Sequence, residues 1–184
     1  MACPQHRLAQ GVERVADGVF AAWERWEGRL DGPLRVCHGD LKISNLLFDA
    51  RGEGVCLLDL DTIANLSLDI EMGDALRSWC NPAGEDVDDA RCDPSLFAAA
   101  SRAWVLACPQ PREEREAIVP AVERICLELA ARFAADALRE SYFGWDPKRF
   151  PARGEHNLLR AQGQLSLARS VAAQRKVLNA CLLG

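Results

Sequence analysis

The chain of 184 residues has no apolar run close to the roughly 20 residues that a membrane-spanning helix needs. Its first residues, MACPQHRLAQGVERV, also lack the long apolar centre of a secretion signal. These two absences argue against a membrane span and against export, and we expect a cytoplasmic protein.

Paired cysteines are missing as well. The chain has eight cysteines, but none of them forms a Cys-x-x-Cys pair. Cys56 and Cys126 lie inside apolar runs, where a free thiol packs as a small hydrophobe. The pattern therefore does not favour a disulfide scaffold or a metal site built from cysteines.

The chain has fewer basic than acidic residues. The net charge is -5, from 22 basic and 27 acidic residues, which argues against a nucleic-acid partner. From residue 148 onward the balance reverses, with seven Lys or Arg and one acidic residue. Two interpretations stay open: a solvated basic helix packed near an acidic body, or a docking face for an anionic substrate or partner.

What is present suits a globular protein. The composition is 49% hydrophobic and 27% charged, and the length suffices for a real core. The sequence shows no internal repeat and no low-complexity linker, so we predict one domain over residues 1–184.

Apolar residues spaced by three and four predict helices over most of the chain. The first covers 5–30, including Leu30, and stops before a Gly-Pro pair. The second follows Thr62, with Asp69 as a plausible N-cap. A third opens at Asp93 and Pro94, which read as N-cap and first helical residue.

Two further helices complete the predicted body. Pro120 is expected to separate a short helical turn from a long helix over 120–141, because proline disrupts a helix interior. A final helix over 155–181 is expected to bury Leu158, Leu165, Ala172 and Leu178.

Between the first two helices lies a different stretch, residues 37–62, which reads CHGDLKISNLLFDARGEGVCLLDLDT. Two short β-type runs, 45–48 and 55–58, flank a turn sequence, DARGEG, and predict a hairpin. Strand signals elsewhere are negligible. The predicted fold class is therefore mainly α with one small β-hairpin.

This stretch gathers oxygen-bearing side chains. Asp40 follows a His-Gly pair, Asn45 comes five positions later, and Asp59 ends an apolar run. Each residue also has an ordinary structural explanation. Asp40 could cap a turn, Asn45 could be an amide at a strand edge, and Asp59 could start a turn. Together they point to phosphoryl transfer, which needs one carboxylate to orient a hydroxyl and an amide with a second carboxylate to hold Mg²⁺.

The motifs carry a family resemblance. HGDLKISN resembles the catalytic loop of the protein-kinase-like superfamily, and its His-Gly-Asp form is similar to the aminoglycoside phosphotransferase and choline kinase branch. LLDLDT resembles the metal-binding motif of that branch. With MGDALRSW, the set looks closest to sugar kinases of the N-acetylhexosamine kinase type. The resemblance implies the helical C-terminal lobe of the kinase-like fold and an ATP- and Mg²⁺-dependent transfer to a hydroxyl of a sugar, aminoglycoside or amino alcohol.

The resemblance also implies roles. Asp40 would be the catalytic base, Asn45 a Mg²⁺ ligand, and Asp59 the Mg²⁺ ligand that bridges the β- and γ-phosphates of the nucleotide. Lys42 would meet the γ-phosphate, although an exposed lysine is an equal reading.

Three further residues would support the site. His38 would be structural, with its ring bonded to the backbone around Asp59. Asp74 would brace the catalytic loop through backbone N–H groups, and Asp61 is an accessory candidate. Segments 74–79 and 142–145 are candidate acceptor-lining positions, with core packing as the alternative for the aromatic residues of the second segment.

Such kinases also need an N-terminal lobe with a Gly-rich loop and a strand lysine. Only 36 residues precede Cys37, no GxGxxG occurs, and the three lysines are Lys42, Lys148 and Lys176. The sequence therefore predicts that the N-lobe is absent and that this chain alone is weak or incomplete. We expect an exposed apolar patch where an N-lobe or second chain would cover the site, with a homodimer possible.

Two alternatives remain beside the kinase reading. The chain could be an inactive kinase-like module that binds a metabolite or a partner. VCLLDLDT alone resembles the nucleophile motif of haloacid-dehalogenase-type phosphatases, but that family is expected to have repeated βαβ units.

Overall fold

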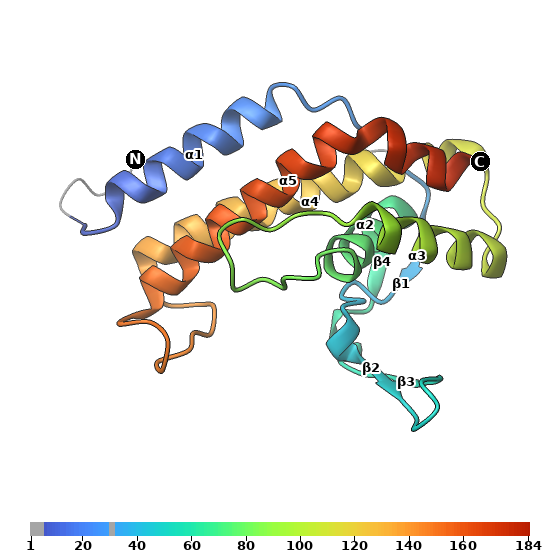
Figure 1. Cartoon of the computed structure of the whole chain (residues 1–184), viewed down its shortest axis with the longest axis horizontal. Coiled ribbons are helices and arrows are strands. Elements are labelled where there is room, and N and C mark those ends of the chain that lie inside the picture. The colour runs from blue at the N-terminus through green and yellow to red at the C-terminus, as the bar shows by residue number, and fades with distance from the viewer. Residues whose placement is uncertain (1–5, 30–31) are drawn as a thin grey trace.

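The computed structural model describes residues 6–29 and 32–184, and two long helices organise it (Figure 1). Helix α4 (Arg112–Arg139) and helix α5 (Arg153–Leu183) run side by side. Helix α1 (Ala9–Trp23) lies along one side of this pair. Helices α2 (Leu68–Trp79) and α3 (Pro94–Ala107) lie on the other, next to the strands.

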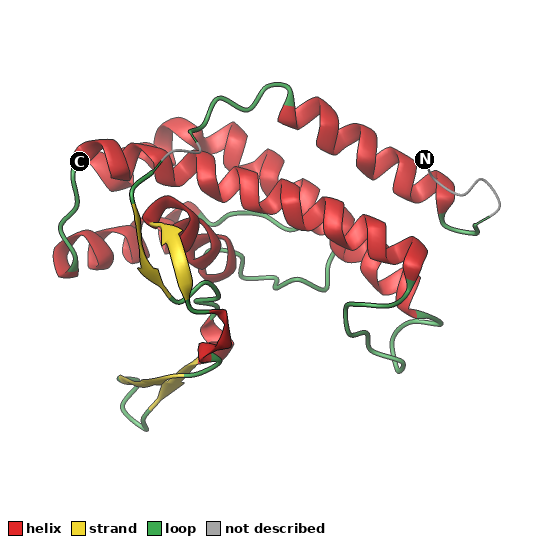
Figure 2. Cartoon of the chain, turned by 180° about the vertical axis from the view of Figure 1, so that it is seen from behind, coloured by secondary structure: helices red, strands yellow, loops and turns green. Residues whose placement is uncertain are grey.

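The strands form two antiparallel sheets of two strands each, which are yellow in Figure 2. Strand β2 (Leu46–Phe48) pairs with β3 (Gly54–Leu57), as the hairpin prediction required. Strand β1 (Leu34–Cys37) pairs with β4 (Ala64–Ser67), which the sequence did not indicate. The expectation of a single hairpin was therefore wrong, although the structure is mainly helical as predicted.

The β1–β4 pair brackets the motif stretch. Its register places Cys37 opposite Ala64 and Leu34 opposite Ser67, so the chain leaves the body through β1 and returns through β4. Both strands are short and largely exposed, which leaves no alternating pattern to read in the sequence. The hairpin β2–β3 projects away from the helices (Figures 1 and 2).

The first two helices differ from their predicted bounds. Helix α1 ends at Trp23 rather than near residue 30, and the predicted Leu30 lies outside the described residues. Beyond the helix, the Trp26 indole donates a hydrogen bond to the Pro120 carbonyl at 2.8 Å. Helix α2 has Ser67, not Asp69, at its N-cap, and Asp69 lies in the first turn.

Helix α3 begins as predicted. The Asp93 carboxylate accepts the backbone N–H groups of Ser95 and Leu96, at 2.7 and 3.1 Å, and Pro94 occupies the first turn. The N-cap and N1 prediction is confirmed.

Helix α4 is continuous through Pro120, so the predicted division was wrong. An internal proline costs about 3 kcal/mol because it removes a hydrogen bond and crowds the preceding turn. Buried residues on both sides of it, Ile118, Val119, Ala121 and Val122, anchor the helix against the core and outweigh that cost.

Helix α5 buries Leu165 and Leu178 as expected, whereas Leu158 is half-buried and Ala172 is exposed. Val171 is buried in place of Ala172. Which side of each turn is buried depends on the neighbouring helices, α1, α3 and α4, that cover α5 along its length, and the spacing of its apolar residues does not reveal this.

One hydrophobic core joins all five helices, with members such as Val12, Met72, Phe97, Leu127 and Leu167. The seven described cysteines are free thiols, several of them inside this core. Within the described part of the chain, no helix has the length and apolar character to cross a bilayer.

The strand region, residues 34–67, is packed quite differently. Ten of the sixteen exposed large hydrophobic residues of the described chain lie within it. They are Leu34, Val36, Ile43, Leu47, Phe48, Val55, Leu57, Leu58, Leu60 and Ile63, here named the apolar strand surface. The sequence predicts an exposed apolar patch where an N-lobe or second chain would cover the site, and a cover at the apolar strand surface stays a prediction.

Candidate functional site

The backbone after β1 packs directly against the backbone before β4. Gly39 has φ of +83°, and a Cβ at this position would lie 2.6 Å from the Thr62 carbonyl oxygen. The Thr62 hydroxyl donates a hydrogen bond to the His38 carbonyl at 2.7 Å. Only glycine allows this close approach, so residues 38–40 and 59–62 form one compact unit.

A glutamate of helix α2 fixes this unit to the helical body. The buried Glu71 carboxylate accepts the backbone N–H groups of His38 and Gly39, each at 2.8 Å. The brace that was assigned to Asp74 therefore belongs to Glu71, three residues earlier on the same helix. The Trp79 indole adds a second tie, donating to the Leu41 carbonyl at 2.6 Å.

His38 links the loop to the end of the hairpin. Its Nδ1 accepts the Asp40 backbone N–H at 3.3 Å, which leaves the proton on Nε2. Nε2 then donates to the Leu58 carbonyl at 2.8 Å, directly before Asp59. The ring is buried, and its contacts are those of a structural link.

Asp40 is positioned through one of its two carboxylate oxygens. Oδ2 accepts from the Lys42 ammonium at 2.5 Å and from the Asn45 amide nitrogen at 3.0 Å. The same Asn45 nitrogen also donates to the Asp40 carbonyl at 2.9 Å. Oδ1 accepts no hydrogen bond from the described residues, so it is the oxygen available to a bound hydroxyl.

Nearby carboxylates affect the pKa of Lys42. The hydrogen bond to Asp40 raises the pKa of Lys42, burial opposes the rise, and the Asp40 and Asp59 charges add to it. Asp59 adopts a left-handed conformation, with φ of 62°, at the start of the 3-10 turn 60–62. Asp61 lies exposed within that turn.

Asp74 belongs to a different ion-pair group on helix α2. Its Oδ1 accepts from Arg77 Nη2 at 3.0 Å, and Arg77 Nη1 reaches Glu85 at 2.8 Å. Burial raises the pKa of the Asp74 carboxyl, and the nearby Arg77 guanidinium offsets this only in part. Arg77 itself is buried, so the two carboxylates compensate its charge.

A cavity of about 680 Å³ lies between the loop at Asp40 and the ion-pair group of helix α2. Asp40, Lys42 and Asp74 line it, whereas His38, Asn45, Asp59 and Asp61 are not among its lining residues. The other lining residues are Gly39, Thr62, Arg77, Glu85, Leu129, Arg132, Phe133, Tyr142, Phe143, Gly144 and Arg160. The segments 74–79 and 142–145 thus both contribute to the wall.

The sequence missed four charged groups near Asp40: Glu71, Glu85, Arg132 and Arg160. Glu71 lies within the same EMGD segment as Asp74, so the helical spacing of three could have suggested it as a second brace candidate. Arg132 and Arg160 come from α4 and α5, and only the tertiary fold brings them to the cavity.

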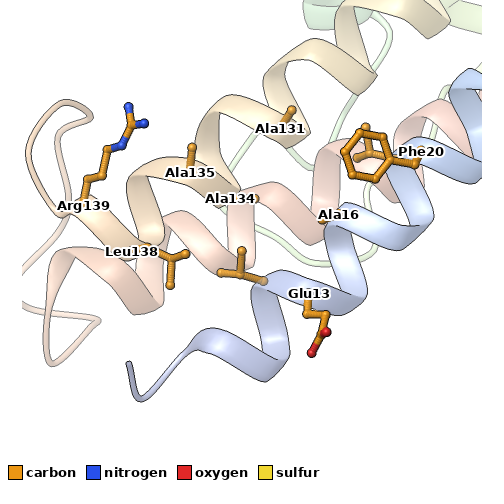
Figure 3. Close-up of a pocket in the computed structure, with 10 residues that line it drawn as sticks. Glu13, Ala16, Phe20, Ala131, Ala134, Ala135, Leu138 and Arg139 are labelled. Carbon is orange, nitrogen blue, oxygen red and sulfur yellow. The ribbon is translucent and has the colours of Figure 1, made fainter. Parts of the chain in front are cut away.

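A second pocket, of about 670 Å³, lies between α1 and α4 (Figure 3). Its lining is mostly apolar, with Phe20 and several alanines, and Glu13 and Arg139 at its edges. None of the residues predicted to carry chemistry lies in it.

Oxygen donors for a hard cation are available at the loop. The Asn45 amide nitrogen is committed to Asp40, which leaves its amide oxygen for a cation, and the Asp59 carboxylate is exposed. In the described residues, no group of three or more His, Cys, Asp or Glu side chains could hold a metal ion. The donor set fits Mg²⁺, which is commonly held by one or two protein oxygens together with substrate phosphates.

Comparison with known families gives a match over more than half of the chain. The family model described as "Phosphotransferase enzyme family" (APH) matches residues 3–105. The matched range contains the loop at Asp40, the hairpin, Asp59 and helix α2 with Glu71 and Asp74. Helices α4 and α5 lie beyond it.

Proposed function

The chain belongs to the phosphotransferase enzyme family, and on this premise we propose that it takes part in ATP-dependent phosphoryl transfer to a hydroxyl of a small molecule. This makes it a kinase of the small-molecule type, in a cytoplasmic setting where ATP is at hand. Acceptors of the kind that the resemblance implies are sugars, aminoglycosides and amino alcohols, with N-acetylhexosamine-type sugars as the most specific suggestion.

The observation that carries the proposal is the state of Asp40. One carboxylate oxygen is fixed by Lys42 and Asn45, and the other has no partner among the described residues and belongs to a cavity-lining residue. A carboxylate held in this way can accept the proton of a bound hydroxyl and orient that hydroxyl. The carboxylate oxygens of a turn-capping aspartate would instead accept hydrogen bonds from nearby backbone N–H groups.

In the proposed reaction, every bond that forms or breaks and the proton that moves can be assigned. The acceptor oxygen forms a bond to the γ-phosphorus, the bond from that phosphorus to the bridging oxygen of ADP breaks, and the acceptor proton passes to Asp40 Oδ1. Asn45 and Asp59 would hold Mg²⁺, which neutralises the negative charge of the phosphates when bound. Lys42 holds Asp40 in position through its hydrogen bond to Oδ2 and adds positive charge beside the site.

A cover for the nucleotide is also part of the proposal. The apolar strand surface borders the loop and presents ten large apolar side chains to solvent. We assign it to contact with an N-lobe or a second chain, including a second copy of this one, because patches of this kind mark interaction sites. On this account the strand surface and the cover together enclose the nucleotide.

A second candidate is a kinase-like binding module without catalysis. The exposed strand surface favours it, because a module without a cover retains an acceptor cavity but few nucleotide contacts. The phosphatase alternative has less support, because both described sheets are antiparallel and a βαβ unit requires parallel strands.

The test is phosphoryl transfer from ATP to a panel of sugars, aminoglycosides and amino alcohols. We expect Mg²⁺-dependent transfer, with an Asp40→Asn variant reduced by at least about a hundredfold, since general base catalysis contributes about 10²–10⁴. Asp88→Asn, on the exposed loop after α2, is the matched control and should keep full activity. Acceptor binding without any transfer would favour the binding module.

A further inference from the structure

Most cations of the cavity wall are neutralised by the protein itself. Lys42 contacts Asp40 at 2.5 Å, and Arg77 contacts Asp74 and Glu85 at 3.0 and 2.8 Å. Arg160 contacts Asp86 at 2.7 Å. A cavity whose charges were all matched in this way would favour a neutral ligand.

Arg132 is the exception. It lines the cavity from helix α4, and no carboxylate of the described residues lies within 4 Å of its guanidinium. Two acids lie one helical turn away, Glu128 and Asp136, but both have other partners. Glu128 accepts from Arg124 at 2.6 Å, and Asp136 accepts from the loop after α4. The five N–H donors of Arg132 are thus left for a ligand.

Aromatic rings hold Arg132 in place. Its guanidinium carbon lies 5.8 Å from the centre of the Tyr142 ring and 5.4 Å from that of Phe143. Phe143 in turn packs on Phe133, with 4.3 Å between the ring centres. A guanidinium over two rings gains cation–π stabilisation and loses little freedom when a ligand binds.

The loop that presents these rings is itself anchored. The buried Asp136 carboxylate accepts the backbone N–H groups of Ser141, Tyr142 and Phe143 at 2.9 to 3.0 Å. The carboxylate also accepts from the Asn157 amide at 2.8 Å and from the Ser141 hydroxyl at 3.5 Å. Arg132 therefore stands on a fixed platform and is not a freely moving surface side chain.

We propose that the acceptor carries an anionic group, a carboxylate or a phosphate, which Arg132 binds while Asp40 orients the hydroxyl that receives the phosphoryl group. This inference rests on the proposed function. A planar guanidinium with free donors matches a carboxylate or phosphate in a paired geometry. The acceptor class is then a hydroxylated small anion, and cationic aminoglycosides and amino alcohols are disfavoured because their ammonium groups would face Arg132 unpaired.

Of the basic residues after position 148, Arg160 lines the cavity, and Asp86 already pairs with it. Attraction of an anionic acceptor by Arg132 would weaken as the salt concentration increases.

The test compares polyhydroxylated probes with the same number of carbon atoms and different charge: D-gluconate and neutral D-glucitol, which are open chains, and D-glucose 6-phosphate and cationic D-glucosamine, which are mainly rings. Dissociation constants are measured by titration calorimetry without nucleotide, so failure of phosphoryl transfer does not alter the outcome. We expect at least one anionic probe to bind about tenfold or more tightly than glucitol, because a charge-assisted contact supplies that much. Glucosamine should bind most weakly.

Variants then test whether Arg132 is the residue that produces the preference for anionic probes. Arg132→Gln should bring the ratio of anion to glucitol affinity close to one, and Arg132→Lys should retain part of it. Arg102→Gln removes an exposed arginine from α3, outside the cavity, and should leave the ratio unchanged. Because Arg132 is exposed, its replacement should lower the melting temperature only slightly, through the loss of its contacts with the Tyr142 and Phe143 rings.

Three outcomes would overturn the proposal. The first is that neither anionic probe binds more tightly than glucitol. The second is that Arg132→Gln leaves the anion preference intact. The third is that inorganic phosphate alone binds as tightly as the anionic probes through Arg132, which would assign the residue to the phosphate of the nucleotide.

Discussion

The two halves of the candidate site are supported in opposite ways. On the side of the helices, the loop is tied to buried groups: Glu71 accepts two of its backbone N–H groups, and Trp79 donates to another of its residues. On the side of the strands, the hairpin and the apolar strand surface are open to solvent. On the proposed function, the helical side forms the wall that faces the acceptor, and the strand side, which would face the nucleotide, is open to solvent.

Glu71 ties the loop to the helical body through two hydrogen bonds. Glu71→Ala leaves two buried N–H groups without an acceptor, so we expect a loss of about 3 kcal/mol in the free energy of unfolding. Urea titration measures this loss. Glu116→Ala removes an exposed partner of Arg112 and should cost about 0.5 kcal/mol or less. Equal losses in both variants would show that the loop does not depend on the helical body.

The next test concerns the close approach within the loop. Gly39 and Gly52 have nearly the same φ, +83° and +82°, but only Gly39 faces a backbone atom where a Cβ would lie. Gly52→Ala should cost about 1 kcal/mol from conformation alone. Gly39→Ala should cost about 1–2 kcal/mol more and reduce phosphoryl transfer. If thermal unfolding gives equal shifts for both variants, the contact with Thr62 has no energetic weight.

The helical body should show its own acid dependence through Asp136. Burial raises the pKa of this carboxyl, but the backbone N–H groups of Ser141, Phe143 and Tyr142 outweigh it, and the pKa lies below its ordinary 3.8. A lowered pKa stabilises the fold above pH 3.8, and that stabilisation disappears as the pH falls through the lowered value.

We therefore expect Asp136→Asn to lose about 1–2 kcal/mol at pH 7, because its amide cannot accept from the three backbone N–H groups, the Ser141 hydroxyl and the Asn157 amide together. The difference from the wild type should shrink once the pH falls below 3.8. Thermal unfolding of both proteins at pH 7 and near pH 3 measures it. A difference that stays constant or grows in acid would contradict the assignment.

The smallest effect on stability belongs to the apolar strand surface. Replacing Val36 and Val55 by threonine should change the free energy of unfolding by no more than about 0.5 kcal/mol, because both side chains are exposed. The same change should reduce the binding of a hydrophobic dye and any self-association. Leu106→Gln with Val177→Gln removes two exposed apolar groups from the helical body and serves as the control. Equal dye binding in all three proteins would remove the distinction between the two surfaces.

Local patterns in the sequence predicted what depends on local chemistry. The hairpin, the Asp93 cap and the grouping of Asp40, Lys42 and Asn45 all follow from residues a few positions apart. The β1–β4 pair, the continuity of α4 through Pro120 and the position of Arg132 could not be predicted in this way. Each depends on contacts between segments far apart in the chain, which outweigh local propensity. Glu71 lies between these cases, since its helix was predicted and its hydrogen-bond partners were not.

The most direct test of the central claim is Mg²⁺-dependent binding of ATP to this chain, measured by titration calorimetry with and without Mg²⁺. We expect weak binding that requires Mg²⁺, that Asp59→Asn abolishes, and that Asp88→Asn leaves unchanged. Weak binding is expected because the strand side is open. Tight ATP binding by this chain alone, or binding that survives Asp59→Asn, would contradict a phosphotransferase site that is complete toward the acceptor and open toward the nucleotide.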